Sequence, residues 1–184
     1  MTSETCTPLK GHCACEAVKY EVLAPFICVQ CCHCTQCQRE TGAAFALNAI
    51  VETSNFRIIS SNQPLRTEIV QPSGEIGMMA RCPICYTGLF RDYDGDGTIM
   101  TYVKAGTLDD ESKKSIQPTG HIFTSTKLDW VDLTSERERG IPVVQEHYKR
   151  REVWSDEANA RYDILLQKEA AAKKAKAARK ESEA

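Results

Sequence analysis

The chain has 184 residues, ten of them cysteine, and a formal net charge of −2 at pH 7. This length suits one domain with a real core, and the near-neutral charge argues against a basic field that recruits nucleic acid. No stretch approaches the roughly 18 apolar residues of a membrane span, and the N-terminus lacks a secretion signal. We therefore expect a soluble protein whose partner is a small molecule, without nucleic-acid or membrane binding.

The cysteines are clustered at short spacings, which favours metal binding over disulfides. Cysteines two or three residues apart make poor disulfide partners and good chelators. Reduced cysteines in turn indicate a reducing compartment, so we predict a cytoplasmic location.

The N-terminal part is expected to hold a loose lead-in and one strand. Residues 1–8 carry Thr, Ser, Pro and a single Cys and are predicted to be a flexible lead-in. Val18, Tyr20 and Val22 alternate with charged or polar neighbours, which predicts a half-buried strand. Just before it, a Cys-x-Cys pair, Cys13 and Cys15, can face one side and supply half of a zinc site.

The densest cysteine cluster follows this strand. Cys32, Cys34 and Cys37 form Cys-x-Cys-x-x-Cys, a spacing that brings three thiolates within reach of one ion. Zinc takes four tetrahedral ligands, so three from the protein leave a position for water or substrate, as in catalytic sites. Cys28 or Cys31 would close that position if either supplied a fourth ligand, which would argue against catalysis.

Short strands punctuated by turns are expected through the middle of the chain. The mostly apolar run 45–51 is predicted to be a core strand, because glycine and Ser-Asn bound it. Further strands are expected at 56–59, 66–70 and 77–81, with a Pro-Ser-Gly turn at 72–74. The fold class is therefore predicted to be mainly β.

A second cysteine pair completes the site begun near the N-terminus. Cys82 and Cys85 form Cys-x-x-Cys, and together with Cys13 and Cys15 they make a closed four-thiolate site, the arrangement of structural zinc. Because metal at these cysteines closes a long loop, we expect the site to stabilise the domain strongly.

The acidic run 92–97, Asp-Tyr-Asp-Gly-Asp-Gly, is similar to the start of a calcium-binding loop. The twelfth position of such a loop needs a bidentate Glu, but here it is Val103. Apolar residues flank the run on both sides, so we interpret it as the turn of a β-hairpin rather than a calcium site.

Two histidines lie close to these motifs. His121 is a candidate general acid or base, because the unperturbed pKa of histidine is near neutrality. It precedes the apolar Ile122 and Phe123, so a hydrogen-bonded structural histidine is an equal alternative. His33 lies between two predicted ligands and is expected to point away from the ion.

From about residue 146 the composition shifts, and Ala, Lys and Glu dominate the end of the chain. Acidic residues at 156–157 mark a helix start, and Ala158, Tyr162 and Leu166 recur at helical spacing. We predict a helical extension over 146–184 whose basic end is partly disordered. The alternative is an arm that docks on an acidic partner or on a second subunit, which would give a homodimer.

Five separated motifs resemble, in order, the glutathione-dependent formaldehyde-activating enzyme family, often called GFA, whose domain also occurs in centromere protein V. They are Gly-His-Cys-Ala-Cys at 11–15, Cys-His-Cys-Thr-Gln-Cys at 32–37, Cys-Pro-Ile-Cys at 82–85, Val-Lys-Ala-Gly-Thr-Leu-Asp at 103–109, and Pro-Thr-Gly-His-Ile at 118–122 with Lys-Leu-Asp-Trp at 127–130. The resemblance covers about residues 9–145, which we interpret as one zinc domain.

This resemblance implies small antiparallel sheets pinned by two zinc ions. By position, one ion would be structural and bound by Cys13, Cys15, Cys82 and Cys85, and the other would be catalytic and bound by Cys32, Cys34 and Cys37. The sequence departs from the family pattern at Glu16 and Tyr86, where a glycine usually follows each cysteine pair. Both departures bear on the geometry of the local turns.

The implied reaction joins a thiol to an aldehyde carbon, or cleaves the carbon–sulfur bond. A zinc ion with an exchangeable position suits it, because the ion can bind sulfur as thiolate or polarise oxygen as a Lewis acid. We therefore expect a carbon–sulfur lyase or synthase that acts on thiol adducts, such as glutathione conjugates, of an aldehyde or another small electrophile. Arg39, Arg81 and Lys127 are candidates to hold substrate carboxylates.

Two other functions fit the same residues. In the first, both ions are structural and the chain is a zinc-stabilised interaction module without catalysis, whose basic extension recruits a partner. In the second, the cysteine cluster senses redox state and releases zinc on oxidation. A labile ion that leaves without unfolding would favour the enzyme, since structural ions leave together with the fold.

Overall fold

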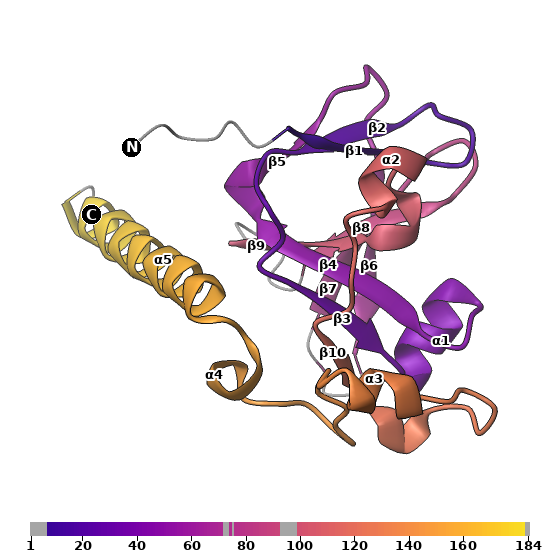
Figure 1. Cartoon of the computed structure of the whole chain (residues 1–184). Coiled ribbons are helices and arrows are strands. Elements are labelled where there is room, and N and C mark those ends of the chain that lie inside the picture. Colours follow the sequence, from indigo (N-terminus) through magenta and orange to yellow (C-terminus); the bar gives the residue numbers. More distant parts are fainter. Residues whose placement is uncertain (1–6, 72–73, 75, 93–98, 183–184) are drawn as a thin grey trace.

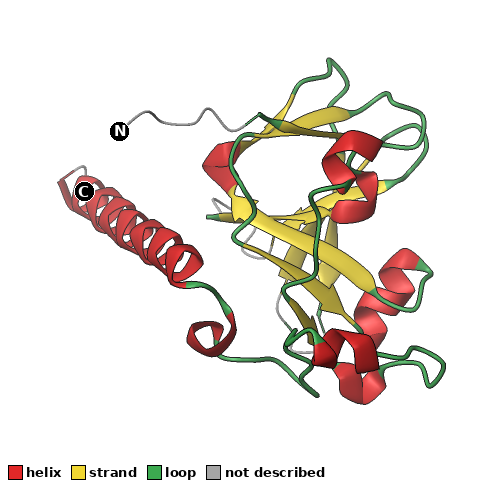
Figure 2. Cartoon of the chain, viewed as in Figure 1, coloured by secondary structure: helices red, strands yellow, loops and turns green. Residues whose placement is uncertain are grey.

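The structure is a computed structural model that describes residues 7–71, 74, 76–92 and 99–182. These residues form a three-stranded sheet, a seven-stranded sheet and a C-terminal helical segment that lies to one side of the sheets (Figure 1). Strands dominate the body of the molecule, and the helices between them are short (Figure 2). The predicted fold class, mainly β with a C-terminal helix, is confirmed.

The small sheet is antiparallel and has the strand order β1-β2-β5. Its strands are β1 (Leu9–His12), β2 (Lys19–Val22) and β5 (Phe56–Ile58). Along β2, Tyr20 and Val22 are buried while Lys19 is exposed, as expected of a strand with one face on the core. The alternation in the sequence therefore located this strand to within a residue.

The large sheet has the strand order β10-β3-β4-β9-β8-β7-β6. Its strands are β3 (Cys28–Cys32), β4 (Ala46–Glu52), β6 (Leu65–Val70), β7 (Ile76–Arg81), β8 (Gly88–Asp92), β9 (Met100–Lys104) and β10 (Gly120–Ile122). Neighbouring strands are antiparallel except for the edge pair β10 and β3, which is parallel. Every residue of β3 is buried, which places its cysteines inside the molecule.

Several sequence predictions fall partly on residues outside those described. The strands β8 and β9 pair antiparallel, which agrees with the predicted hairpin. Its turn at 93–98, with most of the calcium-like positions, lies outside the described residues, as do residues 1–6 of the lead-in and 72–73 of the Pro-Ser-Gly turn. Asp92, the first calcium-like position, is described and forms an ion pair with Arg66.

The helices lie between strands and at the end of the chain. They are α1 (Thr35–Thr41), α2 (Asp110–Lys113), α3 (Thr134–Glu138), α4 (Arg150–Val153) and α5 (Asp156–Ser182), with short 3₁₀ turns η1 (Thr53–Asn55), η2 (Ala105–Thr107) and η3 (Thr124–Thr126). The long helix begins at the acidic residues where the sequence predicts a start, while the fraying of its end stays a prediction. None of the described helices combines the length and apolar character that a bilayer span requires.

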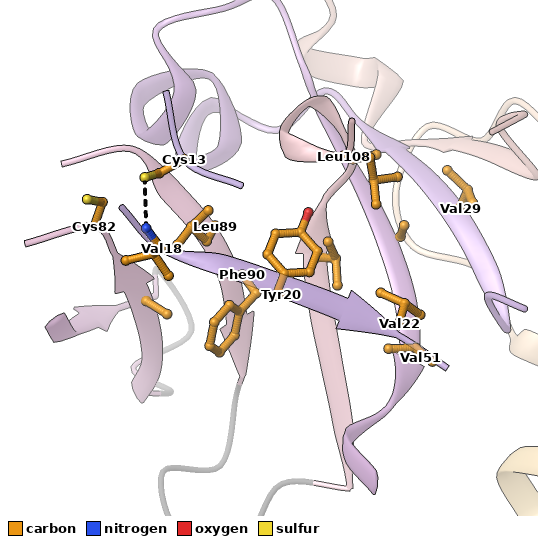
Figure 3. Packing of buried hydrophobic residues seen from close by; sticks show 14 residues of the cluster. Cys13, Val18, Tyr20, Val22, Val29, Val51, Cys82, Leu89, Phe90 and Leu108 are labelled. Carbon is orange, nitrogen blue, oxygen red and sulfur yellow. Dashed lines mark hydrogen bonds between the residues drawn. The ribbon is translucent and has the colours of Figure 1, made fainter. Parts of the chain in front are cut away.

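The main core lies between the two sheets. Tyr20 of the small sheet is completely buried, and its ring centroid lies 5.1 Å from that of Phe56. Phe56 in turn lies 4.6 Å from Phe90 of β8, so aromatic rings join the two sheets. Figure 3 shows Cys13 and Cys82 at one end of this cluster, with their sulfur atoms next to the packed side chains.

Candidate metal centres and the adjoining cavity

The structure brings together the four cysteines predicted to form the closed site. Cys13 and Cys15 follow β1, while Cys82 and Cys85 lie on the turn between β7 and β8; the four sulfur atoms all lie within 4.8 Å of one another. Individual sulfur–sulfur distances are 3.5 Å for Cys13 and Cys15 and 3.7 Å for Cys15 and Cys82. A tetrahedral zinc with bonds of about 2.3 Å places its sulfurs about 3.8 Å apart, so this donor set fits zinc.

Backbone amides surround these sulfurs in tight turns. The amide of Val18 lies 3.3 Å from the Cys13 sulfur, and that of Ile84 lies 3.4 Å from the Cys82 sulfur. A hydrogen bond with the hydroxyl of Thr87 lowers the pKa of Cys85 to about 5. Donors aimed at sulfur favour the thiolate form, which is the form that binds metal.

The two departures from the family pattern lie in these turns. Glu16 and Tyr86 each have φ of 58°, in the left-handed region that favours glycine. The amide of Glu16 donates to the carbonyl of Cys13 at 2.9 Å, and that of Tyr86 donates to the carbonyl of Cys82 at 3.0 Å. Both turns thus keep their geometry with a non-glycine residue in a strained conformation.

The second cysteine group lies where β3 ends and α1 begins. Cys32 is the last residue of β3, Cys34 caps the N-terminus of α1, and Cys37 lies in the first turn of that helix. Their sulfur atoms lie within 4.8 Å of one another, and the amide of Cys37 donates to the sulfur of Cys34 at 3.4 Å. Hydrogen bonds from Cys32 and Cys37 lower the pKa of Cys34 far below its ordinary value, which favours its thiolate, the form that binds metal.

Neither neighbouring cysteine joins this second group. Within the described part of the chain, the group contains only three ligand residues. Cys28 is buried beside Tyr148, and burial raises the pKa of its thiol to about 12. Cys31 lies 3.7 Å from Nε2 of His33, so it belongs to a different cluster. The described residues therefore give this group three ligands, one fewer than a closed tetrahedral site needs.

Two buried histidines form a series of side-chain contacts next to the second group. Nε2 of His33 and Nδ1 of His121 are 3.0 Å apart, and Nε2 of His121 lies 3.5 Å from a carboxylate oxygen of Glu136. Burial lowers the pKa of both histidines, that of His33 to about 4, so both are neutral near pH 7. Cys31, His33 and His121 also satisfy the distances of a metal-binding group. His33 lies between Cys32 and Cys34 in the sequence, so this chain of contacts adjoins the second group.

The second cysteine group opens into a cavity of about 670 Å³. Cys32, Cys34 and Cys37 line one side of it, and Gln30, Asn48, Ile50 and Ile122 line the adjoining sheet. The C-terminal segment also lines the cavity, through His147, Tyr148, Arg150, Trp154, Tyr162, Leu166 and Glu169. His121 is not among the lining residues.

The basic residues at this cavity differ from the three predicted from sequence. Arg39 is exposed on α1, Arg81 lies near the carbonyl of Tyr86, and Lys127 donates to the carbonyl of Leu128 at 3.0 Å. None of the three lines the cavity, whereas Arg91 and Arg150 do. The only signal for Arg150 in the sequence is its place among aromatic residues between 147 and 162.

Comparison with protein-family models agrees with these motifs. A family model described as "Glutathione-dependent formaldehyde-activating enzyme" matches residues 8–126. Among solved structures, a crystal structure of a Rhodobacter sphaeroides protein is similar, with 19% sequence identity and a TM-score of 0.41; the match covers 74% of this chain and 99% of that chain. No curated protein matches the sequence.

Proposed function

The chain belongs to the glutathione-dependent formaldehyde-activating enzyme family, and on this premise we propose that it is a zinc-dependent carbon–sulfur lyase or synthase acting on thiol adducts. One observation carries the proposal. Three clustered thiols, with no fourth ligand in the described chain, face a cavity large enough for a substrate. A closed site would have no room for an exchanging sulfur or oxygen.

The proposed reaction adds a thiol across an aldehyde carbonyl, or reverses that addition. In the forward direction the carbon–sulfur bond forms, the carbonyl π bond breaks, and the thiol proton ends on the new hydroxyl oxygen. No oxidant or reductant is needed, because the electrons balance within the two reactants. Zinc, when bound, supplies a Lewis acid that lowers the pKa of a thiol or polarises a carbonyl oxygen.

The residues of the cavity have distinct proposed roles. Cys32, Cys34 and Cys37 would hold the second ion, while Arg91 and Arg150 would attract the carboxylates of a glutathione-type adduct. The local charge supports this role. Arg91 and Lys104 both form ion pairs with a single carboxylate, that of Glu40, so these three residues together carry a net positive charge. Arg39, Arg81 and Lys127 stay weaker candidates, because they lie away from the cavity.

The structure favours a positioning role for His121 over a catalytic one. Its ring is held between His33 and Glu136 and does not line the cavity. We propose that it orients His33 and thereby the backbone between Cys32 and Cys34, as hydrogen-bonded histidines near metal sites commonly do. General acid–base catalysis by His121 stays a prediction.

Metal analysis of the full chain tests the proposal. We expect two zinc ions per chain, one of which brief chelation removes while the circular dichroism of the fold is retained. Cys34→Ser should hold one ion fewer and lose at least about a hundredfold in the rate of adduct formation from glutathione and formaldehyde. Cys28→Ala is the matched control, a buried cysteine outside both groups, and should keep both ions.

Two outcomes would favour the alternatives. If both ions leave only when the chain unfolds, the interaction module without catalysis becomes the better function. If Cys28→Ala loses the second ion, Cys28 is the fourth ligand of that ion, and the site is closed rather than catalytic. We also propose a cytoplasmic location, because clustered free cysteines need a reducing compartment; a homodimer formed through the basic extension stays a prediction.

A further inference from the structure

We infer that residues 144–169, which lie beyond the region matched by the family, form a specificity wall that selects adducts carrying a bulky aromatic group. The inference rests on the proposed function, since it names the substrate class of the same site. We call this segment the C-terminal wall. It would make the site prefer aryl-bearing thiol adducts over the one-carbon adduct of formaldehyde.

The size of the cavity is the first argument. Its volume is about 670 Å³, within the range of about 300–1,000 Å³ in which proteins enclose drug-sized ligands. A one-carbon electrophile would occupy only a small part of it beside the thiol. Because one continuous cavity reaches from Cys34 to Trp154 and Tyr162, a substrate sulfur near the cysteines leaves room for a large group near the wall.

The C-terminal wall is anchored to the sheets. The amide of His121 donates to the carbonyl of Pro142 at 2.8 Å, and that of Phe123 donates to the carbonyl of Glu146 at 3.0 Å, so the chain enters the wall beside β10. Further on, Nε of Arg161 donates to Glu52 at the end of β4, at 2.8 Å. These contacts tie the start of the wall and the first part of α5 to the sheets.

Polar contacts fix the aromatic rings within the wall. The hydroxyl of Tyr148 accepts a hydrogen bond from Nε1 of Trp154 at 2.8 Å. It accepts another from the side-chain amide of Gln30, a residue of β3. The rings of Trp154 and Tyr162 meet edge to face with centroids 5.5 Å apart. Since both rings are only half-buried, they present a preformed aromatic surface to the cavity.

One guanidinium of the wall lies beside its aromatic rings. The guanidinium of Arg150 lies 4.7 Å from the centroid of the Tyr162 ring and pairs with Asp163. Arg151 pairs with the same carboxylate, so two cations share one anion. Glu169 also lines the cavity. An aromatic surface beside the Arg150 guanidinium suits a ligand that carries both an aromatic group and a carboxylate, such as an aryl adduct of glutathione.

Binding of stable thioethers tests this inference separately from catalysis. The probes are S-methylglutathione and S-(1-naphthylmethyl)glutathione, titrated into the zinc-loaded full chain by calorimetry. We expect the naphthylmethyl probe to bind at least about tenfold more tightly, because only its ring reaches the wall. Equal affinity for the two probes would overturn the inference.

Two variants and a control locate the effect. Trp154→Ala should abolish most of the gain in affinity for the naphthylmethyl probe. It should leave the affinity for S-methylglutathione within about twofold of that of the unsubstituted chain. Leu166→Trp, which fills the cavity from a partly exposed position, should also exclude the larger probe, and it leaves the contacts of Trp154 in place. Trp130→Ala, at an exposed tryptophan outside the cavity, is the control and should change neither affinity. An advantage that survives both wall variants would also overturn the inference.

Failure of this inference is distinguishable from failure of the proposed function. If the formaldehyde adduct turns over but the naphthylmethyl probe has no advantage, catalysis stands and the wall is not a specificity element. If the naphthylmethyl probe shows the expected advantage but no adduct turns over, the wall binds aryl thioethers and the catalytic proposal fails.

Discussion

At the scale of single residues, Glu16 and Tyr86 show how a metal site tolerates strain. Both adopt φ of 58°, where a side chain crowds the backbone and glycine does not. Neither side chain offsets this cost through burial, because Tyr86 is 65% exposed and the ion pair of Glu16 with Lys19 lies on the surface. The metal-binding turn, closed by hydrogen bonds to the cysteine carbonyls, therefore imposes the conformation.

Tyr86→Gly should consequently stabilise the zinc-loaded protein by about 1 kcal/mol, because it relieves the left-handed strain. Urea unfolding followed by circular dichroism gives the free energy. Tyr86→Ala is the matched control, since it removes the same ring but keeps a Cβ, and we expect no gain from it. Equal stabilisation by both variants would assign the effect to the exposed ring instead of the backbone.

Gly11 shows the opposite case, in which only the absence of a side chain allows close packing. A Cβ at this position would lie 2.2 Å from Cζ of Tyr20 and 2.7 Å from the carbonyl oxygen of Thr107. Tyr20 has little freedom to move, because it is buried and its hydroxyl lies 2.7 Å from that of Thr107.

Gly11→Ala should therefore destabilise the protein by about 1–3 kcal/mol through overpacking. The control is Gly106→Ala, because a Cβ at Gly106 meets no atom within 4 Å and should change stability by less than about 0.5 kcal/mol. Urea unfolding of both variants measures the difference. If the two lose the same amount, the contact with Tyr20 is not the cause.

At the scale of elements, the attachment of α5 depends on a partly buried ion pair. Arg161 forms two hydrogen bonds with Glu52 at the end of β4, and Asn55 donates a third. Burial opposes the charged form of Glu52, but the bonds and charge of Arg161 outweigh it, so the pKa of Glu52 lies below its usual 4.5. Because the folded pKa is depressed, this stabilisation is complete above pH 4.5 and is lost as the pH falls through the folded value.

Arg161→Leu should weaken the docking of α5 by about 1.5–3 kcal/mol at pH 7, because it leaves Glu52 without its charged partner. Hydrogen exchange of residues 156–166 measures the docking directly. In the unsubstituted chain we expect their protection to decline below pH 4.5, and in the variant it should already be low at pH 7. Lys168→Leu, at an exposed position of the same helix, should keep the protection of the unsubstituted chain.

The elements also show what the sequence could predict. The cysteine pairs, the three-cysteine group and strands such as β2 depend on local spacing and alternation, which can be read from neighbouring residues. Helix α1 was missed because six of its seven residues are polar and a single cysteine gives no apolar periodicity. The cavity wall was missed for another reason, since Tyr148 meets Gln30 across 118 positions and nothing local encodes that pairing.

At the scale of the whole molecule, two kinds of interaction join the small sheet to the large one. Aromatic and aliphatic side chains pack between them, and the four-cysteine site links the turn after β1 to the turn between β7 and β8. Cys13 and Cys82 take part in both, because they are buried in the core cluster as well as in the metal-binding group (Figure 3). Loss of this site should therefore affect the small sheet before the large one.

Cys82→Ser provides the test. We expect the melting temperature to fall by more than about 10 °C, because a metal link between distant parts of the chain is lost. Hydrogen exchange at pH 7 should rise first in β1, β2 and β5, while β4 and β9, at the centre of the large sheet, keep their protection. Cys34→Ser, which removes the open site alone, should leave the small sheet protected. Uniform loss of protection over both sheets in Cys82→Ser would mean that the four-cysteine site supports the entire domain as one cooperative unit.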